Sequence, residues 1–230
     1  MTAASDRATP VSVVTALYLG TKTLHTEAER TGVIRDMLRG EASRDGYVML
    51  LRNLLPAYRA LEDGLARHGA TPGLSELAAF RLDRASALEA DLAALAGANW
   101  VNAIDVLPEG EAYGARISEA AQGDGSLLIA HAYTRYLGDL SGGQILQRLL
   151  GKSMALTAQQ GSFYDFPRFD DLAALKISYR AALDRAGGVV DDPDAVIAEG
   201  NVAFTLNIAL SCAIKDRLAS NGAAVADAAE

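Results

Sequence analysis

Apolar side chains recur every three or four residues along most of the chain, and this spacing restricts its fold more than any other feature. In 11–30, for example, apolar or small residues follow this spacing at Val14, Leu17, Thr21 and Leu24. Such spacing places one apolar face along an α-helix. No segment alternates apolar and polar residues for long enough to predict a strand, so the helices must cover one another's apolar faces. The sequence therefore predicts a single all-α domain.

The same periodicity sets approximate boundaries for the helices. They are expected over 11–30, 44–68, 74–96, 113–121, 126–150, 170–186 and 193–219, with 97–112 as a connection that holds at most a short helical turn. Pro56 is expected to kink the second helix, because proline lacks a backbone donor and clashes one turn back. The charges of 74–96 are expected to be exposed. One domain spanning 1–230 is expected, with a core at about 11–219 and frayed ends at 1–10 and 220–230.

Composition narrows the classes of partner. The formal net charge of −8 argues against broad binding to nucleic acid or anionic membranes. The single cysteine, Cys212, excludes an internal disulfide and fits a reducing compartment; its apolar neighbours favour a small core residue over a nucleophile. Neither a signal peptide nor an apolar stretch of the ~18 residues needed to cross a bilayer is evident. A cytoplasmic protein without a membrane anchor is expected.

Three glycines interrupt the helix-favouring stretch 130–151: Gly138, Gly142 and Gly143. Each costs ~1 kcal/mol relative to alanine inside a helix, so together they cost roughly 3 kcal/mol. A tight helix–helix contact or a broken helix would explain them, and spacing alone favours that explanation. The alternative is a flat ligand lying against a helix face that has been bared of side chains.

Charged residues beside these glycines bear on the choice. Arg135 and Asp139 are four apart, and such a pair is usually a solvated ion pair on a helix surface worth a few tenths of a kcal/mol. Beside a bared face, however, the carboxylate could organise ordered water. Residue types and spacing leave both alternatives open.

Three histidines are candidates for binding a ligand or metal. His25 and Glu29 are four apart on a predicted helix, so the carboxylate can accept a hydrogen bond from the second imidazole nitrogen, as is typical of metal-binding histidines. An isolated histidine on a half-apolar helix is nevertheless more often structural. His68 is expected to be exposed, and His131 to pack or form a hydrogen bond.

Two segments together resemble the haem oxygenase family. LHTEAER at 24–30 resembles its proximal-histidine motif, and AYTRYLGDLSGGQ at 132–144 is similar to its distal-helix signature. Weaker similarity extends over roughly 15–215. The resemblance implies a single all-α domain that holds haem between a proximal and a distal helix. It also implies that haem b, as cofactor and substrate, is cleaved to biliverdin, CO and ferrous iron with O₂ and electrons from ferredoxin or an NAD(P)H-dependent reductase.

The resemblance assigns roles to individual residues. His25 would be the axial iron ligand, oriented by Glu29. The backbone of Gly138 and Gly142 would lie closest to the distal face of haem, with Gly143 giving flexibility. Asp139 would hold a distal water network that relays protons to bound dioxygen, supported by Arg135 and Tyr58. A relay through water suits this chemistry, because a strong acid–base group touching the oxygen would favour premature O–O cleavage.

The remaining implied contacts surround the edge of the haem. Lys176 and Arg180, four apart, match the family's propionate-binding pair. The same edge would include Lys22 and Tyr133, and the C-terminal helix would contribute Phe204 and Asn207. One position departs from the family pattern: Tyr18 stands where many relatives carry a basic residue, so that propionate contact would be lost or made by a hydroxyl.

Partners and rival functions follow from the same residues. An acidic electron donor is expected to dock on basic residues near the haem opening, namely Lys22, Arg148, Lys152, Lys176 and Arg180. A monomer without nucleic-acid binding is expected. The main alternative is a non-catalytic haem carrier or sensor, although His25 and Asp139 together weigh against it. A di-iron helical bundle is disfavoured because no Glu-x-x-His sequence occurs, and a purely structural bundle would not explain the glycines.

Overall fold

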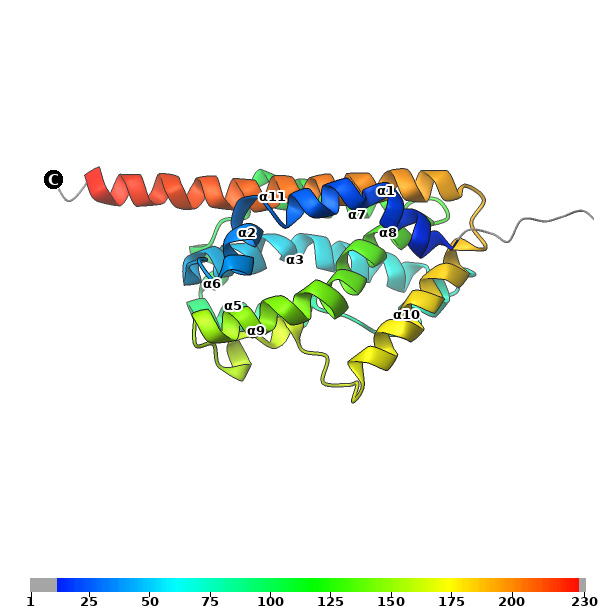
Figure 1. Ribbon diagram of the computed structural model, residues 1–230, viewed down its shortest axis with the longest axis horizontal. Coiled ribbons are helices and arrows are strands. Elements are labelled where there is room, and N and C mark those ends of the chain that lie inside the picture. Colours follow the sequence, from blue (N-terminus) through cyan, green and yellow to red (C-terminus); the bar gives the residue numbers. More distant parts are fainter. Residues whose placement is uncertain (1–11, 228–230) are drawn as a thin grey trace, which may run out of the picture.

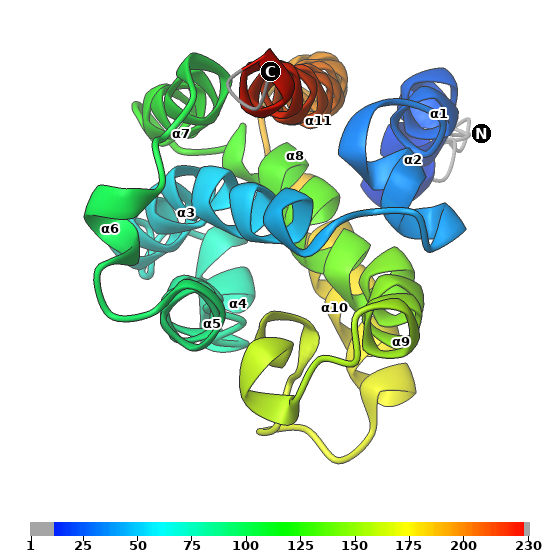
Figure 2. The ribbon, with the colours of Figure 1, turned by 90° about the vertical axis from the view of Figure 1, so that its left-hand side faces the viewer.

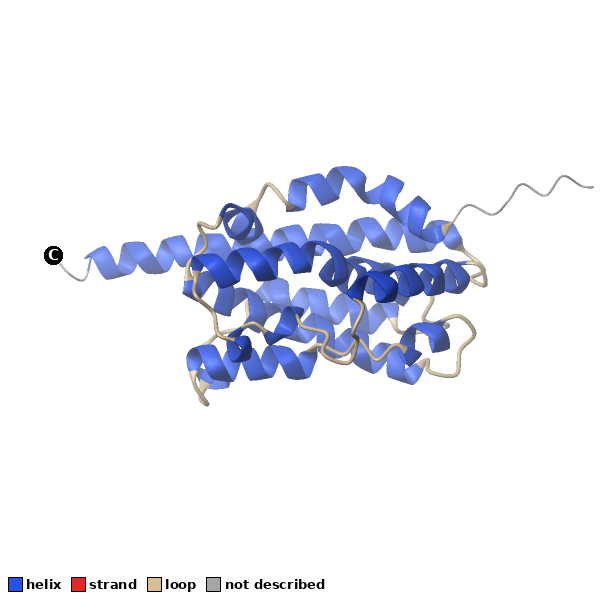
Figure 3. Cartoon of the chain, turned by 60° about the horizontal axis from the view of Figure 1, so that its bottom comes forward, coloured by secondary structure: helices blue, strands red, loops and turns tan. Residues whose placement is uncertain are grey.

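The computed structural model describes residues 12–227, and every regular element in this range is a helix (Figure 3). The α-helices are α1 Val13–Ala28, α2 Gly32–Arg39, α3 Arg44–Arg67, α4 Leu74–Ala79, α5 Ala85–Ala96, α6 Trp100–Ala103, α7 Pro108–Ala120, α8 Leu128–Ala132, α9 Gln144–Ser153, α10 Leu172–Gly187 and α11 Pro193–Asp227. Two π-helical turns, Tyr133–Leu137 and Asp139–Gly143, join α8 to α9, and two 3₁₀ turns, Ala158–Gln160 and Ser162–Tyr164, follow. The predicted all-α class is confirmed.

The helices pack around α3 (Figures 1 and 2). Viewed along the long axis, α3 and α8 lie in the middle, with α1, α7 and α11 on one side and α5, α9 and α10 on the other. The most extensive pairings are α3 with α7 and α1 with α11. By length and composition alone α11 could cross a membrane, but α1, α2, α3, α7 and α8 all pack against it. One face of α11, with Val196, Ala203, Leu210 and Ile214, is buried in the core of the bundle.

The first helix lies directly on the last one. Its N-terminus is capped by the Ser12 hydroxyl, which accepts a hydrogen bond from the Thr15 amide at 3.1 Å. A Cβ on Gly200 of α11 would lie 2.7 Å from the Leu17 side chain. The missing side chain therefore allows α1 to approach α11 closely, which fixes the face on which α1 presents its polar residues.

Some boundaries differ from those predicted. The segment 74–96 forms two helices, since Arg81 between them has a positive φ of 50°. Glu62 on α3 then accepts hydrogen bonds from the Arg84 and Ala85 amides and so caps α5. Helix α7 begins at Pro108 instead of 113, because proline suits the first position of a helix. Helix α2 and the 3₁₀ turns lie in segments for which no helix was predicted.

The ends of the chain differ in part from the prediction. Helix α11 continues to Asp227, so 220–227 is helical, not frayed. Residues 1–10 and 228–230 lie outside the described range. Helix α3 runs through Pro56 without a break, and the kink expected there stays a prediction.

Candidate functional site

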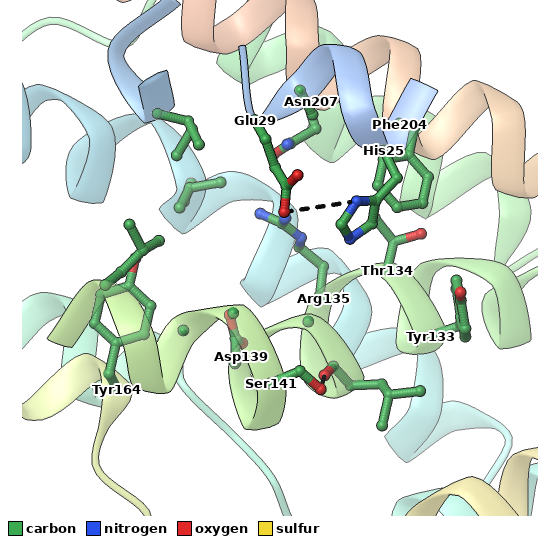
Figure 4. Close-up of a pocket in the computed structure, with 18 of the residues that line it drawn as sticks. His25, Glu29, Tyr133, Thr134, Arg135, Asp139, Ser141, Tyr164, Phe204 and Asn207 are labelled. Carbon is green, nitrogen blue, oxygen red and sulfur yellow. Dashed lines mark hydrogen bonds and ion pairs between the residues drawn. The ribbon is translucent and has the colours of Figure 1, made fainter. Parts of the chain in front are cut away.

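A cavity of about 280 Å³ lies between α1 and the π-helical segment that joins α8 to α9 (Figure 4). Most of the candidate residues line it: His25, Glu29, Tyr133, Arg135, Gly138, Asp139, Gly142, Gly143, Arg180, Phe204 and Asn207. Residues from four separate stretches of the chain thus meet at one site. Its volume is close to the lower end of the usual range for small-molecule sites.

His25 projects from α1 into this cavity (Figure 4). About half of its side chain is exposed, and its ring lies 5.6 Å from the ring of Phe204 on α11. Glu29 approaches from one turn further along, with Oε1 3.8 Å from His25 Nδ1. That distance is too long for the direct hydrogen bond predicted from the spacing, so Glu29 lies near the imidazole without bonding to it.

The opposite wall is the glycine-rich segment, whose turns are wider than those of an α-helix. Its two π turns lie on either side of Gly138. A Cβ on Gly138 or Gly142 would meet no atom within 4 Å, so neither glycine serves a helix–helix contact. Both bare the backbone toward the cavity, and the ligand-facing alternative therefore fits the structure.

Gly143 differs from the other two glycines. A Cβ there would lie 2.8 Å from the Tyr164 ring, which packs against the bare backbone. The structure thus shows a packing reason for this glycine. Its flexibility stays a prediction.

Asp139 is buried behind the bared face and does not lie on the helix surface (Figure 4). Its Oδ2 accepts a hydrogen bond of 2.6 Å from the Tyr58 hydroxyl on α3. Burial raises the pKa of Asp139 to about 6, against the lowering effects of Arg135 and of the Tyr58 hydrogen bond. The carboxyl group can therefore gain or lose a proton close to neutral pH.

Arg135 lies near Asp139 but makes no ion pair with it within 4 Å, in contrast to the surface pair that spacing allows. Its guanidinium carbon lies 5.9 Å from the centre of the Tyr58 ring and 5.8 Å from that of Tyr113. The Arg135 Nε is buried and has no hydrogen-bond partner among the described residues. A cation held by two aromatic rings, with a donor to spare, fits the wall of a site that binds polar groups or water.

The basic candidates are only partly brought together. Arg180 and Tyr133 line the cavity, and so does the half-exposed Tyr18. Lys22 and Lys176 are absent from its lining. The predicted propionate pair therefore contributes one member, Arg180, to the cavity wall.

Several features escaped the sequence analysis. The cavity is also lined by Thr134, Ser141, Phe163, Tyr164 and a group of aliphatic side chains, Ile34, Leu38, Leu50, Leu54, Leu137 and Leu146. The aromatic run at 163–166 was a signal that could have pointed to the wall formed by Phe163 and Tyr164. Within residues 12–227 no group of three or more His, Cys, Asp or Glu side chains could hold a metal ion.

Two histidines prove structural. His68 is buried, contrary to the expected exposure, because its ring nitrogens lie 3.0 Å from the Ala121 carbonyl oxygen and 3.1 Å from the Thr71 hydroxyl. His131 is buried and hydrogen-bonded, as predicted: its Nε2 lies 2.8 Å from Glu199 of α11.

Comparison with known proteins agrees with this geometry. The family model described as Heme oxygenase matches residues 11–213. Haem oxygenase 1 of a Nostoc species is 40% identical over 193 residues, which cover 84% of this chain and 81% of that protein. The chain belongs to the haem oxygenase family.

Solved haem oxygenase structures share its fold. The crystal structure of haem oxygenase 1 from a Synechocystis species, in complex with haem, superposes with a TM-score of 0.83 at 32% identity and covers 96% of this chain and 100% of that one. Haem oxygenase 2 from the same genus, in complex with haem and NO, gives a TM-score of 0.84 at 32% identity over 92% of this chain and 88% of that one. Family membership indicates an enzyme, and it does not favour a non-catalytic haem carrier.

Proposed function

We propose that this protein binds haem in the cavity between α1 and the π-helical segment and cleaves it with O₂ and supplied electrons to biliverdin, CO and ferrous iron. The observation that carries the proposal is the backbone bared at Gly138 and Gly142, across the cavity from His25. A side chain at either glycine would project into the space that a flat ring needs. The mostly apolar wall and a single histidine suit a porphyrin whose iron takes one axial protein ligand.

His25 is the residue we assign to the iron, because its imidazole is half exposed and lies within the cavity. Phe204 packs near its ring and limits the orientations that it can adopt. Glu29, at 3.8 Å, keeps a negative charge near Nδ1 and favours the tautomer that leaves the other nitrogen free to bind. Asn207, on the same face of the cavity, adds a polar group beside them.

Asp139 is the residue we assign to proton handling. Tyr58 donates to its Oδ2, which fixes the carboxyl group and leaves Oδ1 to accept a hydrogen bond from water. Arg135 favours the charged form, while burial raises the pKa of Asp139 to about 6. At neutral pH the group is mostly a carboxylate, yet it can take up a proton at small cost. When bound, haem would supply the iron at which O₂ is reduced and the ring that is oxidised.

The edge of the cavity is where we place the haem propionates. Arg180 offers a guanidinium, and the hydroxyls of Tyr133 and Tyr18 lie on the same lining. Lys22 and Lys176 have long side chains that we expect to reach the propionates from outside the cavity wall. An acidic ferredoxin or reductase domain would then be attracted to the basic residues near the haem opening, which are Lys22, Arg148, Lys152, Lys176 and Arg180. We expect the protein to be a cytoplasmic monomer.

Reconstitution with haem tests the proposal. The purified protein receives haem, a ferredoxin–reductase system and catalase, and the bilin products are separated by chromatography. His25→Ala is expected to shift the Soret band and abolish ring opening until imidazole is added. Thr23→Ala, exposed on the same helix, is the control and should behave as wild type.

Two results would contradict the assignment. Undiminished bilin formation by His25→Ala without imidazole would remove His25 from the iron. Tight haem binding by the wild type without any bilin, under electron supply, would favour the carrier or sensor.

A further inference from the structure

Asp91 of α5 is a fully buried carboxylate that none of the assigned roles uses. It accepts three hydrogen bonds from one short 3₁₀ turn. These come from the Ser162 amide at 2.9 Å, the Ser162 hydroxyl at 2.5 Å and the Phe163 amide at 2.8 Å. Three donors converging on one buried carboxylate make a strong, directional anchor for the turn Ser162–Tyr164.

A cation secures the other side of the same turn. Arg84, at the N-terminus of α5, donates to the carbonyl oxygens of Phe163 and Asp165. Its guanidinium also lies over the Phe166 ring at 4.4 Å. Helix α5 therefore offers an anion to the amides of this segment and a cation to its carbonyls, and both hold it in one position.

The turn held in this way is part of the cavity wall. Phe163 packs edge-to-face against Tyr58, with ring centres 5.3 Å apart, and Tyr58 is the donor to Asp139. Tyr164 fills the space above Gly143, and its carbonyl oxygen accepts a 2.9 Å hydrogen bond from Gln144 of α9. The position of this turn thus determines where Tyr58 and the glycine-rich segment can lie.

Tyr164 also separates two cavities. It lines the main cavity and a second one of about 220 Å³ beside α9, which Tyr47 and Leu150 also line. If the turn Ser162–Tyr164 were displaced, Tyr164 would move out of its position between the two cavities, and Phe163 would no longer pack against Tyr58.

We propose that Asp91 is a positioning residue for the distal side of the site: it anchors the turn Ser162–Tyr164, which in turn holds Tyr58 in hydrogen-bonding register with Asp139. The inference rests on the proposed function for its catalytic consequence. The mechanical part, from Asp91 to Tyr58, concerns the protein without haem.

The first measurement is hydrogen exchange on the haem-free protein. Asp91→Asn keeps the size but loses the charge, and its NH₂ group cannot accept from the amides. The Ser162 amide and hydroxyl, which share one oxygen of Asp91, can still donate to the oxygen that asparagine keeps, whereas the Phe163 amide loses its acceptor. Exchange at Phe163 should therefore accelerate about tenfold, and exchange in 133–143 should rise with it. Glu89→Gln, on the same helix but in an exposed ion pair with Arg59, should leave exchange at Phe163 and in 133–143 unchanged.

The second measurement is made on the haem complex and separates positioning from mere stability. The pH midpoint of the ferric absorption spectrum reports groups on the distal side of the iron, and the bilin isomer ratio reports how oxygen is directed. Asp91→Asn should shift the midpoint and broaden the isomer mixture. Asp91→Glu, which restores the charge, should recover part of both.

The outcomes are distinguishable. If Asp91→Asn unfolds at a lower temperature but keeps the wild-type pH midpoint and isomer ratio, Asp91 only stabilises the fold and does not position Tyr58, and the inference is overturned. If wild-type protein forms no bilin, the proposed function fails, while the exchange and spectral tests of Asp91 still stand. Should Asp91→Asn not fold, Ser162→Ala removes one of the three bonds and should shift the same readouts less.

Discussion

Replacing Asp139 by asparagine should stabilise the haem-free protein at neutral and alkaline pH. Burial raises the pKa of Asp139 from an ordinary 3.8 to about 6, so the folded state holds its proton more tightly than the unfolded chain. Folding therefore costs free energy when the group is ionised, and this cost disappears as the pH falls. Asparagine carries no charge at any pH, and its carbonyl can still accept from Tyr58.

The size of the effect follows from the difference between the two pKa values, about 2 units. At about 1.4 kcal/mol per unit, the full difference is about 3 kcal/mol, as an upper limit. Relative to wild type, Asp139→Asn should lose its advantage as the pH falls through 6, with about half of it gone between pH 8 and pH 5. The sign is opposite to that of an aspartate whose pKa is lowered by a salt bridge.

Urea unfolding of both haem-free proteins at pH 8, 7, 6 and 5 measures this directly. Asp216→Asn, an exposed aspartate on α11, is the matched control and should show little pH-dependent difference from wild type. A stability difference for Asp139→Asn that stays constant from pH 8 to pH 5 would refute the raised pKa. If Asp139→Asn instead became less stable than wild type as the pH rises, the predicted direction of the effect would be refuted.

The same variant tests catalysis. With haem bound and catalase present, Asp139→Asn should keep the His25 ligation spectrum while electron-driven bilin formation falls steeply. In a separate assay without catalase, added peroxide should instead support oxidation of small donors, because asparagine cannot hold the same water network as the carboxylate. Biliverdin formation at the wild-type rate would show that Asp139 does not hold the distal water.

Three further predictions concern other parts of the molecule. Gly142→Ala should stabilise the haem-free protein by about 0.5–1 kcal/mol and weaken haem binding in a spectral titration. Gly143→Ala should destabilise the haem-free protein, because the new Cβ would lie 2.8 Å from the Tyr164 ring. Ferredoxin-driven turnover at subsaturating donor should slow as salt rises while haem affinity changes little, and salt-independent turnover would argue against a basic docking surface. Glu199→Gln should cost about 3 kcal/mol in urea unfolding at pH 7, because it removes the carboxylate that bonds to His131 and Arg116. Burial raises the pKa of Glu199, but these two bonds outweigh burial and hold the pKa at about 2. The stabilisation by Glu199 should therefore fade only as the pH drops from about 4.5 toward 2.

The sequence was sufficient to predict the helical class and much of the site. The spacing of His25 and Glu29 and the bared glycines pointed to residues that do lie on one cavity. Periodicity was informative here because the helices are amphipathic and the glycines break a strong local preference. It could not show that the Glu29 carboxylate stops at 3.8 Å from the imidazole, because side-chain rotamers depend on neighbours such as Phe204.

What the sequence could not reveal depends on contacts between distant segments. Helix α5 begins at Ala85 because Glu62, from another helix, caps it. His68 is buried because the Ala121 carbonyl lies beside its ring. Asp91 occurs in a segment whose charges were expected to be exposed, yet it is fully buried, since its donors come from a turn about 70 residues further along the chain. Local periodicity carries no record of such partners.

The two π turns around Gly138 make the number of residues in this segment as important as their identity. A π-helical turn contains more residues than a turn of a regular α-helix. Deleting a single residue between 133 and 143 would still allow a helix to form. However, every side chain after the deletion would be rotated by about 100° about the helix axis relative to those before it. A deletion before Asp139 would turn both Asp139 and Gly142 away from their present positions on the cavity wall. The segment should therefore tolerate conservative substitutions far better than any change of length, and related chains should differ there in sequence without insertions or deletions.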